Sequence, residues 1–128
     1  IDKEIKINDS THINTNQATL VNYVGHNGLM DFTLTHYPSR IDTTSRKTSV
    51  LACMANVYYN KGLKTCNAEP YVWTTHYMAP EAYTLYAIIN NWMNNKSGSD
   101  ADEAAAQAYN KYQKCGIRGA RNLFKTGF

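Results

Sequence analysis

The chain has 128 residues, of which 43% are hydrophobic and 18% are charged, so it is long enough for one compact domain and too weakly charged for a disordered chain. Its formal net charge of +3 comes from basic residues scattered along the sequence, which argues against a nucleic-acid-binding face. No apolar run reaches the roughly 18 residues that a membrane-spanning helix needs. We therefore expect a soluble protein, either cytoplasmic or exported with its leader removed.

Three cysteines, Cys53, Cys66 and Cys115, leave at least one thiol without an internal partner. A disulfide between Cys66 and Cys115 would leave Cys53 free, a disulfide between Cys53 and Cys66 would block it, and without a disulfide all three stay reduced. The sequence leaves these alternatives open.

The N-terminal residues 1–18 are polar and are interpreted as a linker, with a short alternation at Ile5 and Ile7 that would suit an edge strand. Residues 19–128 then form a single domain. The chain starts at Ile1 and few strands follow, which suits the C-terminal part of a larger domain whose first strands are absent from this sequence.

Three short apolar runs predict three strands, at residues 19–26, 49–54 and 71–75. Long crossovers separate them. Continuous apolar runs joined in this way are typical of parallel strands that are buried on both faces.

Two longer helices follow from the apolar periodicity of residues 80–95 and 99–116. In the first, Pro80 suits the first helical position and Glu81 suits the helix dipole. In the second, Asp100 and Glu103 resemble a capping box.

A shorter helix is expected near residues 55–64, and residues 117–128 are expected to dock on the domain as an amphipathic turn. The resulting order of strands and helices predicts a layered α/β domain with a small, mostly parallel sheet.

Chemically active side chains stand where the predicted strands end. The first strand ends at His26, the second at Cys53, and the third at Thr74, Thr75 and His76. Ligands of parallel sheets bind at the carboxyl ends of the strands. If the first two strands are neighbours, an imidazole stands beside a thiol, which is the pairing of a base with a nucleophile.

The motifs Gly25-His26-Asn27-Gly28 and Ala52-Cys53, each at the end of an apolar strand, resemble those of the caspase-like cysteine peptidases, the group of caspases, gingipains, separase and CHAT domains. His26 precedes Cys53 by 27 residues, which is similar to the spacing in separase. The segments 60–93 and 100–113 also resemble CHAT domains. The resemblance covers residues 19 to about 114 and suggests a divergent bacterial member.

What this resemblance implies is a three-layer caspase-like sandwich and a thiol protease. Cys53 matches the nucleophile and His26 the base, while the backbone N–H groups of Gly28 and Cys53 match the oxyanion hole. The family usually has glycine directly after the histidine, where this chain has Asn27. The alternative is therefore a catalytically inactive interaction module on the same fold.

Family members generally cut after Arg, Lys or Asp, so Asp31 or Glu69 would select a basic side chain, with Thr74 and Thr75 as further candidates for the substrate pocket. A peptide or protein is the expected partner, and no cofactor is expected. A metal site built from His26, His36, His76 and a cysteine is the weaker alternative, because their spacings match no common metal motif.

Overall fold

The sheet of this protein is mixed, with four strands in the order β3-β4-β5-β6. The structure, a computed structural model, describes residues 3–128. β3 (Leu20–Val24), β4 (Arg46–Leu51) and β5 (Ala68–Thr74) run parallel, and β6 (Phe124–Lys125) pairs antiparallel with β5. The three predicted strands and the parallel pairing of these strands are confirmed, although β4 and β5 begin about three residues earlier than predicted.

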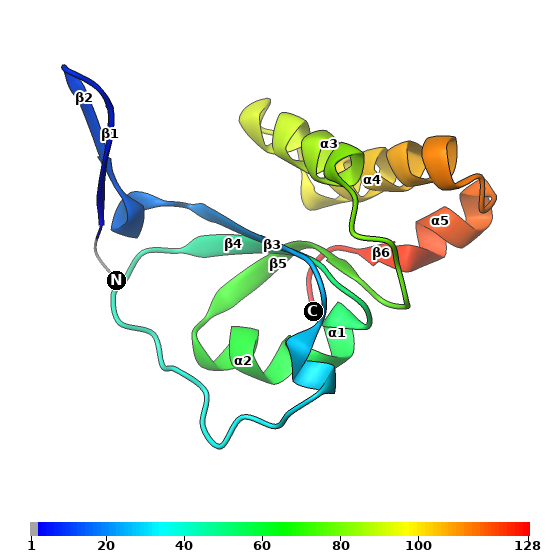
Figure 1. Ribbon diagram of the computed structural model, residues 1–128, viewed down its shortest axis with the longest axis horizontal. Coiled ribbons are helices and arrows are strands. Elements are labelled where there is room, and N and C mark those ends of the chain that lie inside the picture. Colours follow the sequence, from blue (N-terminus) through cyan, green and yellow to red (C-terminus); the bar gives the residue numbers. More distant parts are fainter. Residues whose placement is uncertain (1–2) are drawn as a thin grey trace.

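Helices cover both faces of this sheet (Figure 1). α3 (Ala82–Met93), α4 (Gly98–Gln113) and α5 (Ile117–Leu123) lie on one side, and the short α1 (Ala55–Tyr58) and α2 (Asn60–Thr65) lie on the other. The general α/β class is therefore correct. The single helix predicted near residues 55–64 is two helices, which meet at Tyr59.

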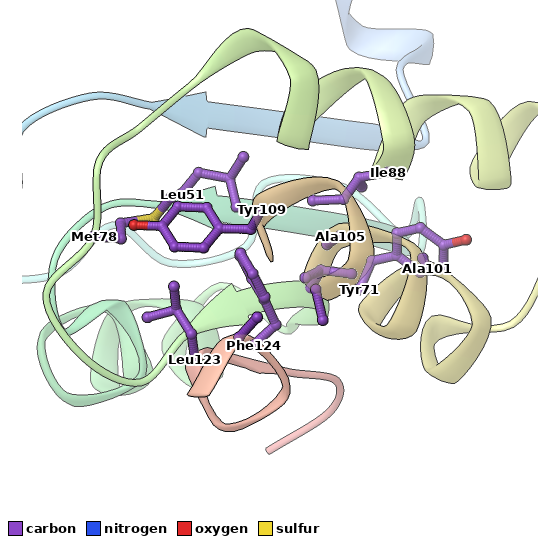
Figure 2. Packing of buried hydrophobic residues seen from close by; sticks show 12 residues of the cluster. Leu51, Tyr71, Met78, Ile88, Ala101, Ala105, Tyr109, Leu123 and Phe124 are labelled. Carbon is purple, nitrogen blue, oxygen red and sulfur yellow. The ribbon is translucent and has the colours of Figure 1, made fainter. Parts of the chain in front are cut away.

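The main core lies between the sheet and the three longer helices, as Figure 2 shows. Leu51 and Ile88 are fully buried there, and three alanines of α4 with no exposed surface, Ala101, Ala105 and Ala106, let the helix approach closely. Val50 and Trp73 point to the opposite face and form a smaller core with α1 and α2. The alternation of Val50 and Leu51 explains why the strand is a continuous apolar run.

The capping box predicted at Asp100 and Glu103 is wrong by one helical turn. Ser97 is the N-cap of α4, its hydroxyl accepts the Asp100 N–H, and the Asp100 carboxylate accepts the Ser97 N–H. The Ser97 hydroxyl also donates to the Asp100 carboxylate at 2.7 Å, and this hydrogen bond, together with that from the Ser97 N–H, holds the pKa of Asp100 below its usual value. Pro80 likewise precedes α3, whose N-cap is Glu81.

The terminal segments contain more structure than predicted. In the N-terminal part, the alternation at Ile5 and Ile7 lies in the strand β1 (Glu4–Asn8). This strand forms an antiparallel hairpin with β2 (Thr11–Asn14), which the 3₁₀ helix η1 (Thr15–Gln17) follows. The hairpin projects from the sheet (Figure 1). The C-terminal segment docks as predicted, but as α5 and the strand β6. Within residues 3–128, no helix is long and apolar enough to cross a bilayer.

Candidate active site

His26 and Cys53 occupy equivalent places at the ends of two hydrogen-bonded parallel strands. The last registered pair of β3 and β4 is Val24 with Leu51, and the Gly25 N–H extends the ladder to the Leu51 carbonyl at 3.1 Å. His26 and Cys53 each lie two residues beyond this pair. The register thus places the base and the nucleophile of the predicted dyad in neighbouring turns on the same edge of the sheet.

The turn that carries Cys53 is held from several sides. Its Sγ–H points toward the Met78 carbonyl at 3.6 Å, and the next residue, Met54, has the left-handed φ of 55° and donates its N–H to the His76 carbonyl at 3.0 Å. The Thr74 hydroxyl donates to the Ala52 carbonyl. The loop after β5 therefore completes the surroundings of the thiol, which is partly exposed.

The His26 ring lies on the surface and binds a carboxylate. Its Nε2 is 2.6 Å from Asp31 Oδ2, and the two side chains are 71% and 63% exposed. Asp31 follows η2 (Gly28–Met30), the 3₁₀ turn after the histidine. A proton held on Nε2 by this carboxylate leaves Nδ1 as the basic nitrogen of the ring.

Two further contacts fix the histidine turn. The Tyr23 hydroxyl donates to the His26 carbonyl at 2.6 Å. The amide nitrogen of Asn27 donates to the Cys53 carbonyl at 2.6 Å, and this asparagine has no exposed surface. From the sequence, Asn27 was only a departure from the family pattern, and neither Tyr23 nor Met78 carried a signal that marked it as part of the site.

The two proposed oxyanion donors differ. The Gly28 N–H donates to the His26 carbonyl at 3.1 Å and is engaged within its own turn. The Cys53 N–H has no hydrogen-bond partner among residues 3–128. Of the two, Cys53 is the donor that a developing oxyanion would find free.

The predicted substrate-pocket residues do not gather around a common hollow. Asp31 binds His26, Thr74 is fully buried, and the Thr75 hydroxyl lies 2.6 Å from the Asn122 carbonyl. Glu69 pairs with Lys47 at 2.7 Å. An apolar cavity of about 540 Å³ lies between the loop after η2 and the helix α2, and Gly28 is one of the residues that line it. None of the predicted substrate-pocket residues lines this cavity.

That cavity has aromatic walls. Tyr23, Phe32, Tyr37 and Tyr59 line it. Burial, together with the neighbouring Tyr23 hydroxyl, raises the pKa of Tyr59 to about 12. Tyr59 therefore lines the cavity and also packs against the smaller core.

The structure also bears on the possible disulfides and on the possible metal site, within residues 3–128. Cys53, Cys66 and Cys115 are free thiols. Within the described part of the chain, no three His, Cys, Asp or Glu side chains form a group that would hold a metal ion.

Comparison of the chain with protein-family models, with curated proteins and with solved structures finds no match. The geometry of the strand ends and the resemblance of the short motifs are therefore the features that point to a function.

Proposed function

We propose that this protein is a cysteine peptidase of the caspase-like kind, in which Cys53 and His26 form the catalytic dyad. The observation that carries the proposal is the equivalent place of the two residues, each two positions beyond the last pair of β3 and β4. The Asn27–Cys53 hydrogen bond of 2.6 Å, which joins the two turns directly, supports it.

In the proposed reaction, His26 takes the thiol proton and the Cys53 thiolate attacks the carbonyl carbon of a peptide bond. The free Cys53 N–H donates to the resulting oxyanion. The carbon–nitrogen bond then breaks, and His26 gives its proton to the leaving amine. Water, deprotonated by His26, hydrolyses the thioester and releases the acid, which restores the thiol.

The proposed reaction requires both side chains to turn away from their described partners. The Sγ–H is directed at the Met78 carbonyl and the imidazole at Asp31. Catalytic hydrogen bonds are often long or misaligned before substrate binds, so this geometry is compatible with the proposal. It also defines the second candidate, an inactive interaction module in which the two side chains never meet.

The test is the pH dependence of Cys53 alkylation by iodoacetamide, followed for each cysteine by peptide mass mapping. An ordinary cysteine is half-reactive near pH 8.5, at about its thiol pKa. We expect Cys53 to react well below pH 8 and faster than the exposed Cys115, and His26→Ala to remove this advantage. Equal rates for Cys53 and Cys115, unchanged in His26→Ala, would support the inactive module instead.

Peptides that differ at the residue before the cut then test the activity itself. The carboxylate of Asp31 is already paired with the imidazole, so we no longer assign it the selection of a basic side chain. Cleavage that is lost in both Cys53→Ala and His26→Ala is the expected result.

A further inference from the structure

Asn27 is fully buried, although the side chain before it, His26, is exposed and Gly28 follows it in the same turn. A buried amide whose hydrogen bonds are unmade costs roughly 1–3 kcal/mol, so such a side chain is retained only where it has partners. Asn27 has two of them. Its amide nitrogen donates to the Cys53 carbonyl at 2.6 Å, and its Oδ1 accepts the Leu29 N–H at 3.1 Å.

These two hydrogen bonds act on the two halves of the site. The bond to Leu29 caps η2 and so shapes the turn that leads to Asp31, the partner of the His26 ring. The bond to Cys53 joins the peptide unit beside the imidazole to the peptide unit of the thiol. The ladder of β3 and β4 ends at Val24 and Leu51, so Asn27 continues the link between the two strands beyond the sheet.

The carbonyls on this turn are held from both neighbouring strands. Asn27 holds the Cys53 carbonyl from the side of β3, and Thr74 holds the Ala52 carbonyl from the side of β5. A glycine at position 27 would have no side chain to do this. The departure from the His-Gly pattern thus places a hydrogen-bond donor where the two turns meet.

We propose that Asn27 is a positioning residue, which sets the distance between the His26 imidazole and the Cys53 thiol through its hydrogen bond to the Cys53 carbonyl. This inference rests on the proposed function. Asn27 touches neither the thiol nor the substrate in this role and acts through the backbone of the cysteine turn.

The test separates the two hydrogen bonds of Asn27. In Asn27→Ser the hydroxyl still caps η2, because serine is a good N-cap, but it is too short to reach the Cys53 carbonyl. Asn27→Asp keeps the size of the side chain and the cap, and replaces the donor that faces Cys53 by an acceptor. The variants are followed by the pH profile of Cys53 alkylation, with Cys115 as an internal standard.

Thr48→Val is the matched control. The Thr48 hydroxyl also joins β4 to β3, because it donates to the Val21 carbonyl at 3.0 Å, and Thr48 is also buried. It lies away from the strand ends. The control therefore removes one buried link between the same two strands without touching the cysteine turn.

We expect both Asn27 variants to lower the rate of Cys53 alkylation at pH 7 at least tenfold and to move its half-maximal pH toward that of Cys115. Thr48→Val should keep the profile of the unchanged protein. A folded Asn27→Ser or Asn27→Asp with the original profile would overturn the positioning role while leaving the dyad intact. The role is also overturned if both variants fail to fold by circular dichroism, because Asn27 would then be a general packing residue.

Failure of the proposed function gives a different result. In that case Cys53 of the unchanged protein reacts no faster than Cys115 at any pH, and the positioning role falls together with the dyad.

Discussion

The His26–Asp31 pair is the most exposed part of the candidate site. At 71% and 63% exposure, both side chains remain largely hydrated, and ion pairs of this kind contribute about 0–1 kcal/mol. The carboxylate therefore serves to orient the ring and select its tautomer, and contributes little as a charge.

The substitution Asp31→Asn should consequently lower the reactivity of the site only slightly. The amide oxygen still accepts the hydrogen bond from Nε2, so we expect a loss of less than about tenfold in peptide cleavage or Cys53 alkylation, as an interaction worth at most about 1 kcal/mol implies. Asp31→Ala should cost more, because the ring then turns freely. Rates for both variants at pH 7 in low and high salt check this, and a larger loss in Asp31→Asn than in Asp31→Ala would contradict the orienting role.

The places of His26 and Cys53 could be predicted from the sequence, because an apolar strand has a visible end and parallel strands place their ends on one edge. The role of Asn27 could not be predicted. A polar residue before a glycine has the composition of an exposed turn, and its burial depends on a carbonyl 26 residues further along the chain.

Helix α4 faces the main core with small side chains. Ala105 has no exposed surface and faces the main core, whereas the adjacent Ala104 is half-buried. The helical spacing of the alanines predicted this helix, but it did not show which alanines are fully buried.

Ala105→Leu should destabilise the protein by about 1–3 kcal/mol, because a close-packed core has no room for three added carbons. Ala104→Leu is the matched control and should change the free energy of unfolding much less. Urea unfolding followed by circular dichroism measures both. Equal effects of the two substitutions would show that the packing at Ala105 is looser than described.

An ion pair joins α4 to α5 in addition to their contacts in the main core. Nε and Nη2 of Arg121 donate to the Glu103 carboxylate at 2.9 and 2.7 Å, and Gln107 donates to it at 3.0 Å. These hydrogen bonds lower the pKa of Glu103 to about 2. Glu103, which the sequence pattern placed in a capping box, thus joins α4 to α5.

Because the pKa of Glu103 is lower in the folded protein than the usual 4.5, the pair stabilises the fold above that usual value and loses this effect as the pH falls toward 2. Glu103→Gln should therefore lower the melting temperature slightly at pH 7, and the difference from the unchanged protein should shrink between pH 5 and pH 2. Thermal melts across this range test the prediction. A difference that grows on acidification would contradict it.

At the scale of the whole molecule, the N-terminal hairpin and the layered domain differ in how they are stabilised. Ile5, Ile7 and Ile13 of the hairpin are all more than 40% exposed, whereas the main core consists of buried side chains. A hydrogen bond of 2.7 Å from the Arg46 guanidinium to the Asn16 carbonyl connects the end of this segment to β4. Short exposed hairpins are marginal in water by themselves.

Removal of residues 1–17 should therefore leave a cooperative unfolding transition and the alkylation profile of Cys53 unchanged. The expected cost is a fall of a few degrees in melting temperature from the lost Arg46 contact. Loss of the folded state in the shortened chain would show that the hairpin is part of the domain.

The order of apolar segments predicted the layers of the molecule. It did not predict the hairpin at the N-terminal end or the strand β6 at the C-terminal end. The alternation at Ile5 and Ile7 indicated the strand β1, but the short sequence of β2 did not indicate the pairing that makes the hairpin. β6 escaped prediction because it has two residues, and its pairing with Trp73 and Thr74 depends on where α5 delivers the chain.

Because Gly28 follows Asn27, this asparagine can deamidate when the chain unfolds. An asparagine followed by glycine is prone to deamidation, since the unhindered glycine nitrogen attacks the side-chain amide and forms a succinimide. In the folded protein the Asn27 amide is held by Cys53 and Leu29, and the Gly28 N–H is held by the His26 carbonyl. Each heat-unfolding cycle releases both groups, so chains should return with aspartate or isoaspartate at position 27 and a gain of about one mass unit. Only the aspartate product is the same as Asn27→Asp, because isoaspartate also lengthens the backbone.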